Sequence, residues 1–78
     1  MKLVVIDGQS GRMGQLLIDR IRSAGLSCEI LVVGTNALAT AAMLKAGADA
    51  GATGENPVLV ACRTAEIIAG PIGILSAD

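Results

Sequence analysis

The 78-residue sequence contains no phenylalanine, tyrosine, tryptophan or histidine. Without aromatic rings there is no platform on which bases stack, and six basic against seven acidic residues create no basic surface. Both features argue against a nucleic-acid partner. The absence of histidine removes the commonest general base and metal ligand, together with every Ser-His or Cys-His catalytic pair.

Cysteines and long apolar runs are also scarce. Cys28 and Cys62 are too few for a zinc site without histidine, so we expect no metal and two free thiols, as in a cytosolic protein. The apolar run at residues 3–6 is too short for a signal peptide, and no run reaches the roughly 18 apolar residues that would span a membrane. The sequence therefore predicts a cytoplasmic protein without a membrane partner.

Apolar residues make up 53% of the chain and charged residues 17%, which is typical of strands buried on both faces of a parallel sheet. Residues 3–6, 29–33, 49–53 and 66–75 are expected to be strands. Residues 12–24 are expected to form a helix, and a second helix starts at a cap on Thr35 or Asn36 and runs to residue 46. A third helix is expected at 58–65, although a strand is nearly as plausible there.

Two sets of apolar residues recur at helical spacing. In the second helix they are expected to face inward and are Leu38, Ala42, Met43 and Ala46. In the first helix they are Met13, Leu16, Leu17, Ile21 and Ala24.

This alternation predicts a single α/β domain over residues 1–78 with a Rossmann-like, three-layer fold. The expected sheet is parallel, with strand order 3-2-1-4 and the first two helices on one face. The chain ends directly after a strand that no helix follows. We therefore expect either a homo-oligomer or the N-terminal part of a longer parent chain.

The most specific motif is a G-x-x-G-x-x-G loop between the first strand and the first helix. Gly8 permits the sharp turn, Gly11 removes a side chain where a pyrophosphate would approach, and Gly14 lets the helix lie close to the strand. The amides from about Ser10 to Met13 are expected to point at an anion at the positive end of the helix dipole. Simple turn chemistry is the alternative explanation of these glycines.

The ligand expected at this loop is NAD(P) or another adenine nucleotide, with the Arg12 guanidinium available to pair with a phosphate. The acid that usually grips the ribose after the second strand is missing, since Thr35 and Asn36 follow Gly34 there. Those two side chains can bond a ribose or phosphate, or simply cap a helix. The predicted cofactor-binding residues are Gly8, Gln9, Ser10, Gly11, Arg12, Met13, Gly14, Thr35 and Asn36.

Further polar groups follow the other strand ends, where ligands of open α/β sheets bind. Asp7 is expected to brace the loop by bonding to its amides, and Glu55 is expected to place a charge at a helix start beside Pro57, although each is also a candidate for ligand contact. The Gly70-Pro71 pair is either a bend that admits a ligand or a way out of a strand. The candidate contacts are Asp7, Thr53, Glu55, Asn56, Gly70 and Pro71.

The loop from Gly8 to Gly14 resembles the nucleotide loop of dihydrodipicolinate reductases, which implies NAD(P)H binding but covers only about the first 20 residues. A wider resemblance rests on five blocks in order. The blocks at residues 5–9, 34–40, 43–49, 51–56 and 70–74 are similar to a family of small bacterial proteins of unknown function with a Rossmann-like fold. This resemblance implies a fold and a longer chain, and it supplies no activity.

Two functions remain open from the sequence. The first is a nucleotide-binding domain, with or without catalysis. The alternative is a non-catalytic module for small-molecule sensing or oligomerisation that needs no nucleotide cofactor.

Overall fold

The computed structural model describes residues 2–54, 67–70 and 73–76. The elements in chain order are β1 (Lys2–Asp7), α1 (Arg12–Ser23), β2 (Glu29–Gly34), α2 (Ala37–Lys45), β3 (Ala50–Thr53), β4 (Ile67–Gly70) and β5 (Gly73–Ser76). The strands and helices predicted up to residue 53 are confirmed, with small shifts at their ends. The helix or strand expected at 58–65 lies outside the described residues.

The five strands form one sheet in the order β3-β2-β1-β4-β5. β1 runs parallel to β2 and β4, and β2 runs parallel to β3, so the α/β class is confirmed. The single strand predicted over residues 66–75 is wrong. β4 and β5 are antiparallel and Gly70 pairs with Gly73, so the chain reverses between these two glycines. The sequence indicated a bend or a strand exit at the Gly70-Pro71 pair, a typical turn signal, but the apolar residues on both sides led to the prediction of one strand.

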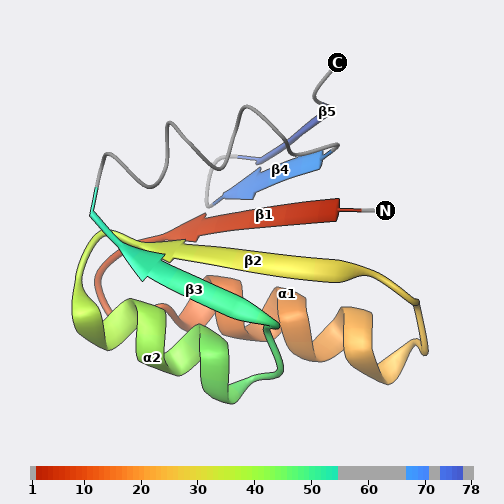
Figure 1. The fold of residues 1–78 in the computed structure, drawn as a ribbon, viewed down its shortest axis with the longest axis horizontal. Helices are drawn as coiled ribbons and strands as arrows, with labels where there is room; N and C mark the ends of the chain where they lie inside the picture. Colours follow the sequence, from red (N-terminus) through yellow and green to blue (C-terminus); the bar gives the residue numbers. More distant parts are fainter. Residues whose placement is uncertain (1, 55–66, 71–72, 77–78) are drawn as a thin grey trace.

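Both helices lie on the same face of the sheet, as predicted (Figure 1). The main core fills the space between this face and the helices, and Cys28 is buried there with its thiol free. On the opposite face Val4 and Val33 are fully buried. The second helical layer of the predicted three-layer fold and Cys62 fall outside the described residues. The buried members of the main core are Leu3, Val5, Ile18, Cys28, Ile30, Val32 and Met43.

The helix faces differ from the prediction at four positions, one of which is Ala24, exposed just after the end of α1. Met13 and Leu16 of α1 are 60% and 54% exposed, and Leu38 of α2 is 67% exposed. α1 contacts both the sheet and α2, so its buried stripe runs through Gly14 and Ile18. Successive residues of a helix point in directions that differ by about 100°. The apolar side chains beside this narrow stripe therefore point to solvent.

Arg22 joins the C-terminal end of α1 to the segments that lead into β2 and β3. Its guanidinium donates to the carbonyls of Gly47 (3.0 Å) and Cys28 (2.8 Å) and to Asp49 Oδ2 (2.9 Å). The same carboxylate accepts the Ile30 amide at 2.7 Å. The Ile30 bond, followed by the bond from Arg22, lowers the pKa of Asp49 from its ordinary value of 3.8. This network lies at the amino-terminal ends of β2 and β3, whereas the glycine loop lies at the carboxyl end of β1.

Among the described residues no helix is long and apolar enough to cross a membrane.

Candidate functional site

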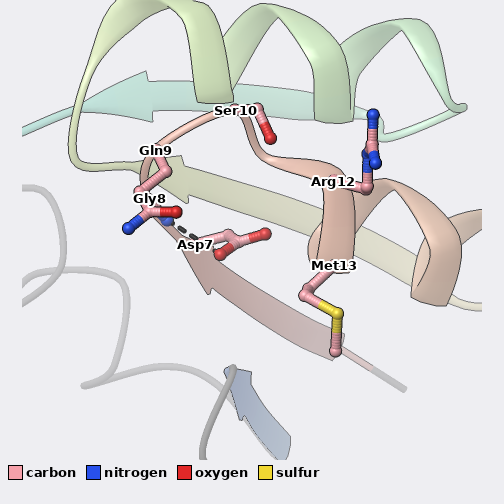
Figure 2. A pocket seen from close by; sticks show the side chains of 6 residues that line it. All are labelled: Asp7, Gly8, Gln9, Ser10, Arg12 and Met13. Atoms are coloured by element: carbon pink, nitrogen blue, oxygen red, sulfur yellow. Dashed lines mark hydrogen bonds between the residues drawn. The ribbon is translucent and has the colours of Figure 1, made fainter.

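A pocket of about 320 Å³ lies at the carboxyl end of β1, at the turn into α1. The glycine loop forms its lining, and Figure 2 shows the side chains that surround it. The lining residues are Asp7, Gly8, Gln9, Ser10, Arg12 and Met13. The structure therefore brings together most of the predicted loop residues, whereas Gly11 and Gly14 do not line the pocket.

The position of this pocket follows from the strand order. β2 and β3 lie on one side of β1, and β4 lies on the other. The strand order therefore reverses at β1, between β2 and β4, and open α/β sheets bind ligands at such a switch point, beyond the carboxyl ends of the strands. The loop after β1 is the segment that the fold places there.

Asp7 supports the loop from inside. It is 7% exposed, and its carboxylate accepts the amide of Gly8 at 2.8 Å and the amide of Gly14 at 2.7 Å. Gly14 is the third residue of α1, and the residue before the helix is Gly11, which has no side chain to cap it. Asp7 therefore supplies the capping oxygen from the adjacent strand. The predicted bracing role of Asp7 is confirmed.

Position 11 requires a glycine because it lies in close contact with α2. Its φ is +74°, a left-handed conformation that disfavours any side chain. A Cβ there would lie 2.6 Å from the carbonyl oxygen and 2.8 Å from the Cα of Ala39. The side-chain position of Gly11 thus faces the backbone of α2 and not a pyrophosphate, which was the prediction from the sequence.

Gly14 and Gly8 also permit close approaches. A Cβ on Gly14 would collide with the side chain of Met43 and lie 3.3 Å from the Cβ of Asp7. Gly14 does let α1 approach β1, as predicted, but its closest neighbour is α2. A Cβ on Gly8 would lie 2.7 Å from the hydroxyl oxygen of Thr35. Met43 was expected to face inward, and it is buried, but its contact with Gly14 and the contact of Ala39 with Gly11 were not predicted. The available signal was a glycine-rich first turn beside an alanine-rich helix.

The loop after β2 is bonded directly to the glycine loop. Asn36, one of the two residues predicted to cap this helix, is the N-cap of α2, because its Oδ1 accepts the Ala39 amide at 2.9 Å. Its Nδ2 donates to the carbonyl oxygen of Gln9 at 2.9 Å. The amide of Thr35 donates to the carbonyl of Asp7 at 3.0 Å. Thr35 and Asn36 therefore lie beside the pocket loop and hold it in place.

The other candidate contacts lie farther away or are not described. Asp7, Gly34 and Thr53 are in register across three strands, which places Thr53 two strands from the pocket. The Thr53 hydroxyl is 2.8 Å from that of Thr40. Gly70 is exposed at the end of β4, on the other side of β1. Glu55, Asn56 and Pro71 lie outside the described residues.

The first turn of α1 retains unused donors. No described residue accepts a hydrogen bond from the backbone amides of Arg12 or Met13, which belong to the group left open at every helix start. The Arg12 side chain is exposed at the same turn (Figure 2). Among the described residues no three His, Cys, Asp or Glu side chains gather as metal ligands. The chemistry available here is therefore anion binding by amides and a guanidinium.

The chain matches a protein-family model. The profile described as "Domain of unknown function (DUF3842)" matches residues 2–78. The chain belongs to this family. The prediction of a small family of uncharacterised proteins is thus confirmed, while the description of the DUF3842 family supplies no ligand or activity. Searches of curated proteins and of solved structures find no match.

Proposed function

We propose that this domain binds a phosphate-bearing ligand, namely NAD(P) or another adenine nucleotide, in the pocket formed by the glycine loop. The observation that carries the proposal is the pair of open amides of Arg12 and Met13 at the start of α1, beside a pocket at the switch point. Amides at a helix start bind phosphate because they donate hydrogen bonds and share the positive end of the helix dipole. The order β3-β2-β1-β4 supports a Rossmann-like interpretation of the fold.

The size of the pocket limits the part of the ligand that it encloses. A volume of about 320 Å³ is at the lower end of small-molecule pockets. It suits one nucleotide or the phosphate-bearing half of a dinucleotide. The exposed polar side chains of Gln9 and Ser10 are suitably positioned for the ribose or a second phosphate.

Asp7 makes Arg12 necessary in this proposal. The Asp7 carboxylate accepts the hydrogen bond of the Gly14 amide. A phosphate bound to the amides of Arg12 and Met13 would therefore lie close to the negative charge of Asp7. Like charges at short range repel, and this cost is offset when a cation faces the same phosphate. Arg12 is the cation among the lining residues.

The test is a thermal-shift titration with NADH, NADPH, ATP and coenzyme A, followed by affinity measurement for any ligand that stabilises the protein. Arg12→Gln should weaken binding roughly 10-fold or more, the scale of a charge-assisted hydrogen bond. Arg20→Gln is the matched control, because Arg20 is an exposed arginine of the same helix outside the pocket. The absence of a shift with all four compounds would refute nucleotide binding.

A second candidate function is self-association without a nucleotide. α2 carries apolar residues on every side, and its Leu38 and Leu44 are 67% and 40% exposed. A helix that is apolar all round is usually covered, and a second copy of the chain would cover it. In light scattering Leu38→Gln should shift an oligomer toward monomer, whereas Leu26→Gln, at an exposed leucine outside the helices, should not. A wild-type protein that is monomeric at high concentration would contradict this candidate.

A further inference from the structure

We propose that Asn36 is a positioning residue for the pocket, which orients the Ser10 amide as a third phosphate donor through the carbonyl of Gln9. This inference rests on the proposed function for its ligand, and its structural part is independent of any ligand. The juxtaposition that carries it is the bond from Asn36 Nδ2 to the Gln9 carbonyl, which joins the N-terminus of α2 to the pocket lining.

Gln9 needs an external support. Its φ is +52°, which makes it the one residue with a side chain in the left-handed region among the described residues. That conformation is unfavourable for a residue with a Cβ and persists where surrounding contacts hold it. Two contacts span this turn. Gly11 donates its amide to the Gly8 carbonyl at 2.9 Å, and Asn36 donates to the Gln9 carbonyl at 2.9 Å.

The Gln9 carbonyl determines where the next amide points. The carbonyl of Gln9 and the N–H of Ser10 belong to the same planar trans peptide, so they point in opposite directions. Because Asn36 fixes the carbonyl on its own side, the Ser10 N–H points to the side away from Asn36. No described residue accepts a hydrogen bond from this N–H, and Ser10 lines the pocket. Ser10 then joins Arg12 and Met13 as an open donor.

The orientation of the Asn36 amide group is determined by its partners. Oδ1 faces the N–H of Ala39, which requires an acceptor, and Nδ2 faces the carbonyl of Gln9, which requires a donor. Asparagine has both atoms on one short side chain, whereas aspartate and serine cap helices equally well but lack the donor that reaches Gln9. The capping role and the positioning role can therefore be separated by substitution.

The test compares three variants at position 36. Asn36→Asp and Asn36→Ser keep the cap of α2 and lose the bond to Gln9, and the first adds a negative charge while the second does not. Asn36→Ala loses both roles. Backbone ¹⁵N relaxation without ligand should show order parameters at Gln9 and Ser10 falling from about 0.85 to below about 0.6 in the aspartate and serine variants alike. The Ala39 amide should stay protected in those two variants and lose protection in Asn36→Ala.

Ligand affinity is the second readout, with ATP as the probe. Asn36→Asp and Asn36→Ser should each bind ATP roughly 3- to 10-fold more weakly, as expected for the loss of one hydrogen bond. Unchanged order parameters at Gln9 and Ser10 in both variants would overturn the positioning role. If wild-type protein does not bind ATP or the other nucleotides, the proposed function fails, and the relaxation data still decide whether Asn36 orients the loop.

Discussion

Two glycines with the same backbone conformation allow the contact between α1 and α2 to be measured. Gly11 has φ +74° and Gly25 has φ +72°. A Cβ on Gly25 would meet no atom of the described residues within 4 Å, whereas a Cβ on Gly11 would lie 2.6 Å and 2.8 Å from backbone atoms of Ala39. Alanine at either position must adopt the left-handed conformation, and only at Gly11 must it also displace a helix. The difference between Gly11→Ala and Gly25→Ala therefore isolates the packing cost.

The expected magnitudes follow from these two costs. The left-handed conformation costs alanine about 1–2 kcal/mol, and the stiffer unfolded chain returns about 0.4–1 kcal/mol. Gly25→Ala should thus lower the free energy of unfolding by about 1 kcal/mol. Crowding a backbone adds roughly 1–3 kcal/mol, so Gly11→Ala should lose about 2–4 kcal/mol. For a domain of this size each kcal/mol lowers the melting temperature by about 4–8 °C.

Urea unfolding followed by far-ultraviolet circular dichroism measures both variants, because the chain has no aromatic residue for fluorescence. The slopes of the two unfolding curves should match that of the wild type, so that the shift in midpoint reports stability. Equal losses for Gly11→Ala and Gly25→Ala would refute the argument, since the contact with Ala39 would then carry no cost. Gly11→Ala with wild-type stability would refute the left-handed assignment as well.

Two further predictions concern carboxylates. Asp7→Asn should lower the free energy of unfolding by about 1–3 kcal/mol, because an amide side chain can accept only one of the two loop N–H groups and turns a donor toward the other. The shift of the urea midpoint measures this loss. A loss no larger than that of Asp19→Asn, at an exposed aspartate, would contradict the prediction. The pKa of Asp49 is lowered by the Ile30 amide and by Arg22, so the unfolded state binds more protons below about pH 5. The contribution of Asp49 to the free energy of unfolding should therefore be constant above that pH and fall as the pH drops through 3.8 and below, and Asp49→Asn should remove this part of the acid dependence in pH-resolved unfolding curves.

The order of elements was predictable because local signals agree with it. Asn36 precedes a helix-forming stretch and caps it, and Gly25 and Gly47 follow the two helices with positive φ. Residues 3–6 and 29–33 form strands because β-branched and aliphatic side chains suit strands that are buried on both sides, as β1 and β2 are at Val4, Val5, Val32 and Val33. The reversal between β4 and β5 was missed because an apolar run indicates burial and does not show the direction of the chain.

The position of the candidate site was also predictable, whereas the contacts that require glycine at positions 11 and 14 were not. A strand, a glycine loop and a helix start occur in consecutive residues, so the sequence alone locates the pocket. The partners of Gly11 and Gly14 are Ala39 and Met43, which lie on the next helix. No local pattern specifies which side of a glycine a distant helix will occupy. The same long-range contact moved the buried stripe of α1 away from Met13.

These contacts change which experiments can test ligand binding at the loop. Thr35, Ala39 and Met43 lie so close to the three loop glycines that a side chain would not fit at any of them. The glycine spacing is therefore accounted for by packing and is not evidence for a bound phosphate. A substitution such as Gly11→Val would disrupt the contact between α1 and α2 and abolish binding whether or not the glycine faces a ligand. The case for a ligand rests instead on the open amides of Arg12 and Met13, and on a cation that the packing does not require. Arg12 is exposed and makes no hydrogen bond to a described residue, so its removal should leave stability unchanged. A loss of nucleotide affinity in Arg12→Gln at unchanged stability is therefore the result that separates a binding loop from a structural turn.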